Sequence, residues 1–331
     1  MLTTSPGRSW TGLALLILLG GCASVPDHLA EYALPSQRIE LDDVPFYPQE
    51  RFQCGPAALT TILAASGSDV MLESVVRQAY LPGRQGSLQL ELVATARSSG
   101  RIPYIIDGSL ASIQRELLAG RPVLVLQNLG VSWYPRWHYA VVVGVEPMSG
   151  AVILRSGTDR RRLTRTATFM RTWQRSDYWA MVALRPGELP AEVESDRYFN
   201  AVSAMESIGD HEAALAGWNA ALSRWPNARI ALFGKGNSLL NLGMHAEAIG
   251  TYRLLLDIDP NMFGARHNLA HALYRQGDCA AAISELDYIL ERVGEGDRFY
   301  SAYESSLNEF TGAGNVAEYC GSPVPASEKY D

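Results

Sequence analysis

The second half of the chain repeats itself with a period of 34 residues. Gly209, Gly243 and Gly277 are 34 residues apart, and Pro226 and Pro260 keep the same step. Other positions in this period are Ala214, Ala248 and Ala282; Leu215, Ile249 and Ile283; and Trp218, Tyr252 and Leu286. The pattern in this half is helical only, and about three units are needed for a stack that buries a continuous core. The sequence therefore predicts an array of helices after residue 196.

The period and its residue order resemble the tetratricopeptide repeat, a helix–turn–helix unit in which a small alanine lets two helices approach closely. The glycine ends the first helix of each unit and the proline follows the second, with Gly294 where a third proline is expected. We expect three repeats over residues 197–294 and a tail over 295–331. The resemblance implies a concave face that binds a peptide or a protein partner.

Three polar residues, Asn237, His267 and His271, fall at positions that line this face. The two histidines are four residues apart, so a metal site must be considered. The stretch HNLAH lacks the glutamate of the HExxH pattern, and no third ligand is evident. We therefore expect surface histidines in a groove, with no metal and no cofactor.

The first half of the chain mixes helical patterns with β-rich runs. The runs PVLVLQ, YAVVVGV and AVILR are typical of buried strands. Residues 80–100 predict a turn and then a helix, a scaffold element that can form part of a groove wall. The segment 184–196 is rich in Pro, Glu and Gly and breaks both periodicities, so it is expected to be a linker.

The N-terminus predicts export. Residues 1–21 combine Arg8 with the apolar run TGLALLILLGG, which is too short to span a membrane and is typical of a signal peptide. LLGGC resembles the lipobox of bacterial lipoproteins, which implies lipidation of Cys22 and a tether over 22–38. Ser24 in place of an aspartate favours the outer membrane, facing the periplasm. The alternative is an ordinary signal peptide in which Cys22 is incidental.

Charge and cysteine content narrow the function further. The net charge of −7 with no basic block argues against a nucleic-acid partner. Export means an oxidising compartment, where Cys279 and Cys320 are expected to form a disulfide rather than remain two free thiols. Cys54 is then left without a partner, so it is either a packed core thiol or a nucleophile.

The sequence around Cys54 favours the nucleophile over the packed core thiol. Pro56 suits the first turn of a helix that runs on to Gly67, so Cys54 lies at or next to a helix N-terminus. The partial positive charge there favours a thiolate, and a nearby imidazolium lowers a thiol pKa further. His138, at the start of a predicted strand, is the candidate partner, because His28 falls in the tether.

Gln49, QCGPAAL with Cys54, and WHYAVVVG with His138 resemble the bacteriocin-processing peptidases, a branch of the papain-like cysteine peptidases. The likeness covers residues 39–183 and implies an α+β papain-like domain. It implies a thiolate–imidazolium pair of Cys54 and His138, with Gln49 in the oxyanion hole. Gln49 stands five residues before Cys54 where the family commonly has six, and Gln53 is the only other glutamine nearby.

The family orients its histidine with an aspartate or asparagine at the end of the next strand, but here that position falls at Arg155 or Ser156. Ser156 can accept a hydrogen bond from the ring, and Asp159 can reach back across a tight turn.

Three functions remain open at this point. The first is a membrane-anchored cysteine peptidase whose repeats recruit a peptide or protein. The second is a non-catalytic binding module on a degenerate peptidase fold, and the third is a thiol acyltransferase. The aromatic residues Trp133, Tyr134 and Trp137 before His138 are expected to pack in the core or, alternatively, to line a substrate cleft.

Overall fold

The computed structural model describes residues 37–49 and 53–312. The predicted signal peptide, Cys22, Ser24, most of the tether and Cys320 lie outside these residues. Within 37–49 and 53–312, no helix is both long enough and apolar enough to cross a membrane.

The first half is built on a seven-stranded sheet in which every paired neighbour is antiparallel. The order along the sheet is β2-β7-β3-β4-β5-β6, with β1 pairing to the far end of β4. The strands are β1 (Ile39–Glu40), β2 (Ile102–Ile105), β3 (Val123–Asn128), β4 (Trp137–Glu146), β5 (Ala151–Ser156), β6 (Asp159–Arg165) and β7 (Ala180–Leu184). The three predicted apolar runs are β3, β4 and β5.

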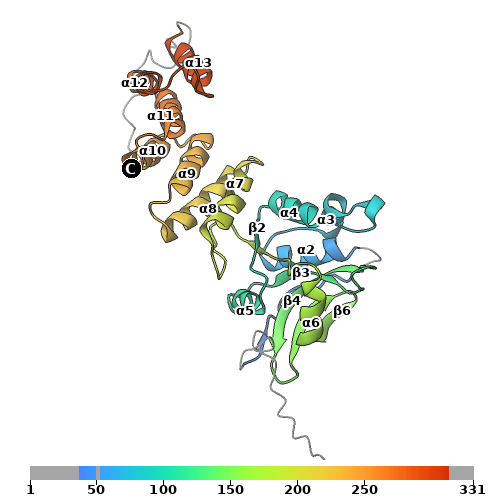
Figure 1. Cartoon of the computed structure of the whole chain (residues 1–331). Coiled ribbons are helices and arrows are strands. Elements are labelled where there is room, and N and C mark those ends of the chain that lie inside the picture. The colour runs from blue at the N-terminus through green and yellow to red at the C-terminus, as the bar shows by residue number, and fades with distance from the viewer. Residues whose placement is uncertain (1–36, 50–52, 313–331) are drawn as a thin grey trace, which may run out of the picture. The chain divides into compact units, whose positions relative to one another are not determined.

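Helices accompany this sheet (Figure 1). They are α2 (Cys54–Ala65), α3 (Leu72–Ala79), the short 3₁₀ helix η1 (Pro82–Arg84), α4 (Gln89–Ser98), α5 (Leu110–Leu118) and α6 (Thr166–Gln174). Leu59, Ile62 and Leu63 of α2 pack with Val141 and Val143 of β4 in one buried cluster. Because side chains alternate along a strand, this face of β4 is apolar throughout and fixes α2 against the sheet.

The second half is helical, as the repeat predicts. Its helices are α7 (Ser195–Glu206), α8 (His211–Arg224), α9 (Arg229–Asn241), α10 (His245–Ile258), α11 (Phe263–Gln276), α12 (Cys279–Leu290) and α13 (Tyr300–Thr311). Gly209, Gly243 and Gly277 separate the two helices of each pair and have φ of +82°, +74° and +92°. The left-handed conformation at these turns explains why glycine recurs with the period.

One helix lies where the sequence predicts only a tail. α13 follows the third repeat, and its Tyr303 and Phe310 are buried in the same cluster as Leu269 and Leu273 of α11. α13 thus covers the apolar side of the last repeat. Cys279 is disulfide-bonded, and its predicted partner, Cys320, lies outside the described residues. The fold class, an α+β domain followed by an all-α repeat region, is confirmed.

Candidate active site

The sulfur of Cys54 lies at the N-terminus of a helix. Cys54 is the first residue of α2 and Pro56 lies in its first turn. Gly55 permits the approach of a neighbouring loop, because a β-carbon there would lie 2.8 Å from the side chain of Ser87. Cys54 is neither sealed in the core nor fully exposed. The thiol is therefore accessible to a ligand.

Two cavities meet at Cys54. The narrow one has a volume of about 10 Å³ and is lined by Gln49, Tyr139 and Ser156 among others. The wide one has a volume of about 600 Å³ and extends past Ser87, Trp137 and Tyr139. Gln49, predicted to stabilise an oxyanion, thus shares a cavity with Cys54.

Gln49 is held in place by the turn between β5 and β6. Its backbone N–H donates to the carbonyl of Gly157 at 3.2 Å. Its side-chain amide nitrogen lies 3.8 Å from where a β-carbon on Gly157 would stand. The φ of +66° at Gly157 favours glycine at this turn. The same turn therefore positions Gln49 and the adjacent Ser156.

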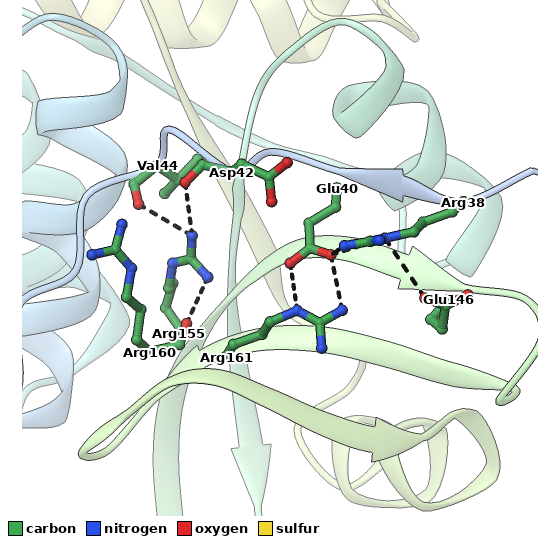
Figure 2. A network of polar contacts seen from close by, with 8 residues as sticks. All are labelled: Arg38, Glu40, Asp42, Val44, Glu146, Arg155, Arg160 and Arg161. Carbon is green, nitrogen blue, oxygen red and sulfur yellow. Dashed lines mark hydrogen bonds and ion pairs between the residues drawn. The ribbon is translucent and has the colours of Figure 1, made fainter.

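The buried guanidinium of Arg155 fixes the chain that leads to Gln49. It donates to the carbonyl oxygens of Arg160 at 2.6 Å and of Asp42 and Val44 at 3.3 Å each (Figure 2). These bonds tie the segment before Gln49 to the β5–β6 hairpin. Arg155, one of the two predicted places for a residue that orients the histidine, instead binds backbone carbonyls.

A carboxylate secures the outer end of the same segment. Glu40 accepts from Nε and Nη2 of Arg161 at 2.8 and 2.9 Å and from Nε of Arg38 at 3.0 Å, and Arg38 also faces Glu146 at 3.6 Å (Figure 2). The hydrogen bonds from Arg161 are the main cause that lowers the pKa of the Glu40 carboxyl. This bidentate pair links the side chain of Glu40 on β1 to β6, in addition to the pairing of β1 with β4.

His138 contacts Ser156, the other of the two positions predicted for a residue that orients its ring. Its Nε2 lies 2.8 Å from the hydroxyl of Ser156, which is 6% exposed. This contact leaves Nδ1 as the ring nitrogen available to a reacting group. Across residues 37–49 and 53–312, however, no hydrogen bond joins the Cys54 sulfur to the His138 ring. The backbone N–H of Tyr139, the residue that follows His138, instead acts on the Cys54 thiol and lowers its pKa.

The electrostatics differ from the predicted ion pair. Burial raises the pKa of the Cys54 thiol, and the backbone N–H groups of Tyr139, Gly55 and Cys54 oppose this rise only in part. Burial, with a smaller contribution from Arg162, lowers the pKa of His138 to about 4. Both shifts favour the uncharged forms, so the site holds a neutral thiol and a neutral imidazole at pH 7.

The two remaining candidates lie apart from the ring. Asp159 begins β6, and its exposed carboxylate faces Arg162 at 3.7 Å. Gln53 precedes α2, and its carbonyl accepts from the N–H of Ala57 at 3.1 Å. Within the part of the chain that the structure describes, Asp159 has no hydrogen bond to His138. Gln53, the alternative to Gln49, does not line the narrow cavity at Cys54.

The repeat residues are more enclosed than predicted. Nε2 of His267 lies 2.9 Å from the hydroxyl of Ser306 on α13, and Nε2 of His271 lies 3.2 Å from it. Both rings are half-buried, because α13 lies against them, and His271 also lines a cavity of about 450 Å³. Asn237 accepts through Oδ1 from the Tyr252 hydroxyl at 2.9 Å and from the Asn268 amide at 2.8 Å. The described residues contain no group of three or more metal-ligating side chains.

Sequence reasoning missed two contributors to the site. The backbone N–H of Tyr139 has no residue signal, because any amino acid supplies it. The role of Arg155 could have been predicted from its place at the end of an apolar strand. A buried arginine there needs several hydrogen-bond acceptors. Trp133, Tyr134 and Trp137 are exposed, so the expectation that they pack in the core is wrong.

Residues 41–181 match the model of the Peptidase_C39 like family, and residues 204–263 match that of the tetratricopeptide repeat. The peptidase domain of Streptococcus ComA, a bifunctional ABC transporter, is 19% identical, with coverage of 43% of this chain and 98% of that one and a TM-score of 0.36. The Sgt2 repeat domain from Aspergillus fumigatus is 23% identical, with coverage of 42% and 91% and a TM-score of 0.35.

A curated relative also matches the repeats. It is the tetratricopeptide repeat and J domain-containing co-chaperone DNJ1 of Fusarium oxysporum f. sp. lycopersici, 29% identical over 100 residues. The match spans 30% of this chain and only 19% of that protein. The chain thus contains a Peptidase_C39-like domain, matched over residues 41–181, followed by tetratricopeptide repeats, matched over residues 204–263.

Proposed function

We propose that the chain is a cysteine peptidase in which Cys54 is the nucleophile and His138 the general base. One observation carries this proposal: the thiol lies at a helix N-terminus where two cavities meet. The backbone N–H of the residue next to His138 favours the ionised form of this thiol. A core thiol would have no cavity on either side. The family match over residues 41–181 supports the same reaction class.

The neutral resting pair sets the order of steps. Nδ1 of His138 takes the proton from the Cys54 thiol as the sulfur attacks the carbonyl carbon of the substrate. The resulting imidazolium then protonates the leaving amine as the C–N bond breaks, which leaves a thioester on Cys54. A water, deprotonated by His138, hydrolyses the thioester and releases the acid. The ring must swing towards the sulfur when substrate binds, as catalytic contacts often tighten only in the complex.

The narrow cavity suits an oxyanion. Its volume is on the order of the space that one water molecule needs. A single carbonyl oxygen fits there, between the side-chain amide of Gln49 and the backbone N–H of Cys54. Both groups donate hydrogen bonds to the charge that forms as the sulfur attacks.

Ser156 would act as a positioning residue in this scheme. If Nε2 of His138 carries the proton and donates to the Ser156 hydroxyl, Nδ1 is left as the acceptor that the thiol needs. A neutral hydroxyl stabilises an imidazolium less than a carboxylate does. We therefore expect turnover to be slower than that of a site with an acid in this position.

The same observations also favour a second candidate, a non-catalytic binding module. The sulfur has no hydrogen bond to the ring within the described residues, and burial disfavours the charged pair. A protein of this kind would bind a peptide in the wide cavity without cleaving it.

The rest of the chain would place the peptidase and supply its substrate. We propose lipidation at Cys22, attachment to the outer membrane on the periplasmic side, and recruitment of a peptide or protein by the repeats. Tethering a second binding site raises the local concentration of substrate at the first.

The test is covalent labelling by a peptidyl chloromethyl ketone, followed by mass spectrometry. We expect one adduct, on Cys54, and a loss of labelling rate of about 10²-fold or more in His138→Gln. His245→Gln, in the repeat region, is the matched control and should label at the wild-type rate. Equal rates in His138→Gln and the wild type would establish the binding module instead.

A further inference from the structure

The loop between β3 and β4 exposes large apolar side chains beside the candidate site. Trp133 is 86% exposed, Tyr134 67%, Trp137 53%, Leu129 48% and Val131 42%. Single apolar residues on a surface are ordinary, but five within nine positions form a patch that marks an interaction site.

This hairpin is held firmly. Oδ1 of Asn128 accepts from the backbone N–H groups of Gly130 and Arg136 at 2.9 Å each. Arg175 donates to the carbonyls of Asn128 and Gly130. A β-carbon at Gly130 would lie 2.3 Å from the Tyr134 carbonyl, so only glycine permits this turn. The aromatic side chains are thus presented by an ordered backbone, which reduces the entropy lost on binding.

The hairpin borders the wide cavity at Cys54. Trp137 lines this cavity together with two further apolar side chains, Leu88 and Leu126 of β3. The volume of about 600 Å³ lies in the usual range of roughly 300–1,000 Å³ for ligand pockets. The cavity therefore has room for bulky side chains directly beside the nucleophile.

A polar group on the same wall lacks a partner. In the part of the chain that the structure describes, Oγ of Ser87 is buried and makes no hydrogen bond. The Ser87 carbonyl accepts from the Tyr139 hydroxyl at 3.4 Å, and its side chain lies against Gly55. A buried hydroxyl costs free energy until it is bonded, and the backbone of an extended peptide offers both donors and acceptors.

We propose that the wide cavity and the hairpin 129–137 bind an extended peptide with a large apolar side chain next to the bond that is cleaved. The substrate class is thus a peptide with an aromatic or branched aliphatic residue at this position, not a two-glycine motif, which would leave the cavity unfilled. The proposal rests on the proposed function, since it assumes that the occupant is the peptidase substrate.

The experiment compares two chloromethyl ketones on the full chain, identical except that one carries a benzyl side chain and the other a hydrogen next to the reactive carbon. In each, the sulfur of Cys54 displaces chloride to form a thioether, and the thiol proton passes through His138 to solvent. We expect the benzyl probe to label Cys54 at least tenfold faster. Trp137→Ala should reduce this preference severalfold.

A steric variant provides the matched comparison. A β-carbon at Gly86, which lines the cavity, meets only the Arg84 carbonyl at 3.9 Å, so we expect Gly86→Phe to fold and to reduce the space in the cavity. Gly83→Phe is the control, because a β-carbon at Gly83 has nothing within 4 Å and the residue does not line the cavity. Gly86→Phe should abolish the preference for the benzyl probe, and Gly83→Phe should retain it.

The outcomes separate the two proposals. Equal labelling of Cys54 by both probes overturns the apolar specificity and leaves the peptidase in place. If neither probe labels Cys54 in the folded chain while both label the unfolded chain, the proposed function falls, and the specificity with it. Equal labelling, together with loss of binding to phosphatidylglycerol vesicles in Trp133→Ala, would assign the hairpin to a membrane instead.

Discussion

Two histidines, one in each half of this chain, have the same type of partner, a serine hydroxyl. Nε2 of His138 lies 2.8 Å from the Ser156 hydroxyl, and Nε2 of His267 lies 2.9 Å from the Ser306 hydroxyl. Burial lowers the pKa of each imidazole to about 4. By bond geometry and electrostatics alone, the two sites are almost indistinguishable.

Their surroundings separate them. The backbone N–H of the residue after His138 opposes the rise in the pKa of a half-buried thiol, which lies where two cavities meet. The His267 ring lies edge-on to the rings of His271 and Tyr303, with centroids 4.8 and 5.0 Å apart. The comparison teaches that a histidine–serine contact is a structural motif in itself. Such a contact would support catalysis only beside a nucleophile that a ligand can reach.

The largest expected effect comes from replacing each ring with a glutamine side chain. His138→Gln should lower kcat/KM for an apolar peptide by about 10²- to 10⁴-fold, because no other group takes the thiol proton. His267→Gln should leave kcat/KM within twofold, because its ring only contacts α13 and its own helix. Turnover of a fluorogenic peptide by both variants measures the difference.

An equal loss of activity in both variants would contradict the functional difference between His138 and His267. Such a result would mean that the repeats control turnover, and the His267 cluster would then be functional. Cys54→Ser gives the baseline for a chain without a nucleophile and should be as inactive as His138→Gln.

The sequence predicted the repeat half well because its signal is redundant. Several independent positions share the period of 34 residues, so an error at one of them changes nothing. α13 was missed because it stands outside the period. Tyr303 and Phe310 are buried only through contact with α11, which no local pattern reveals.

The sequence predicted which residues gather around Cys54 and His138 but not the protonation states of these two residues. Cys54 and Gln49 line one cavity, and Ser156 contacts His138, because the order of helix, strand and turn brings them together. The predicted ion pair depended on the helix terminus, a term of up to about 2 kcal/mol. Burial, which only the three-dimensional packing determines, acts in the opposite direction.

A second pair of variants compares the side-chain amide of Gln49, at the candidate site, with that of Asn237 in the repeats. Gln49→Ala should lower kcat/KM by about 10²-fold, because one donor to the oxyanion is lost. Asn237→Ala should leave kcat/KM unchanged but destabilise the repeats by about 1–3 kcal/mol, because the buried Tyr252 hydroxyl loses its acceptor.

The kinetic assay and urea denaturation together test this pair. A stable but inactive Asn237→Ala chain would show that the repeat amide contacts substrate during turnover and does not merely hold the Tyr252 hydroxyl. An active Gln49→Ala chain would remove Gln49 from the oxyanion hole.

Acid should destabilise the repeats through His267. An unfolded histidine has a pKa of about 6.5, whereas His267 in the fold has a pKa of about 4. Between these values the unfolded state binds more protons, so the contribution of His267 is fully present above pH 6.5 and falls as the pH drops towards 4. The difference between the two pKa values corresponds to about 3 kcal/mol, and solvent screening of the half-buried ring reduces the expected loss to about 2 kcal/mol.

Hydrogen exchange, read by mass spectrometry on α11 and α13, localises this loss. Protection of both helices should fall between pH 6.5 and 4 in the wild type and fall less in His267→Gln. An unchanged pH dependence in His267→Gln would assign the acid sensitivity to other groups, His271 first among them, since its pKa is also lowered by burial.

The smallest expected effect comes from the two serine hydroxyls. Ser156→Ala should lower kcat/KM by about tenfold, because the ring of His138 loses the contact that selects its tautomer, and Ser156→Thr should restore it. Ser306→Ala should leave kcat/KM unchanged and destabilise the repeats by about 1–2 kcal/mol, since this hydroxyl contacts both His267 and His271.

Ser156→Asp distinguishes positioning from packing. A carboxylate beside the ring raises the pKa of His138, so an NMR titration of the ring should move upward from about 4. If Ser156 serves only packing, the carboxylate turns to solvent and the titration stays where it is. If it holds the ring, the shifted pKa brings the imidazolium within reach of neutral pH and kcat/KM rises with it. The repeat site offers no such gain, because a carboxylate at Ser306 has no thiol to activate.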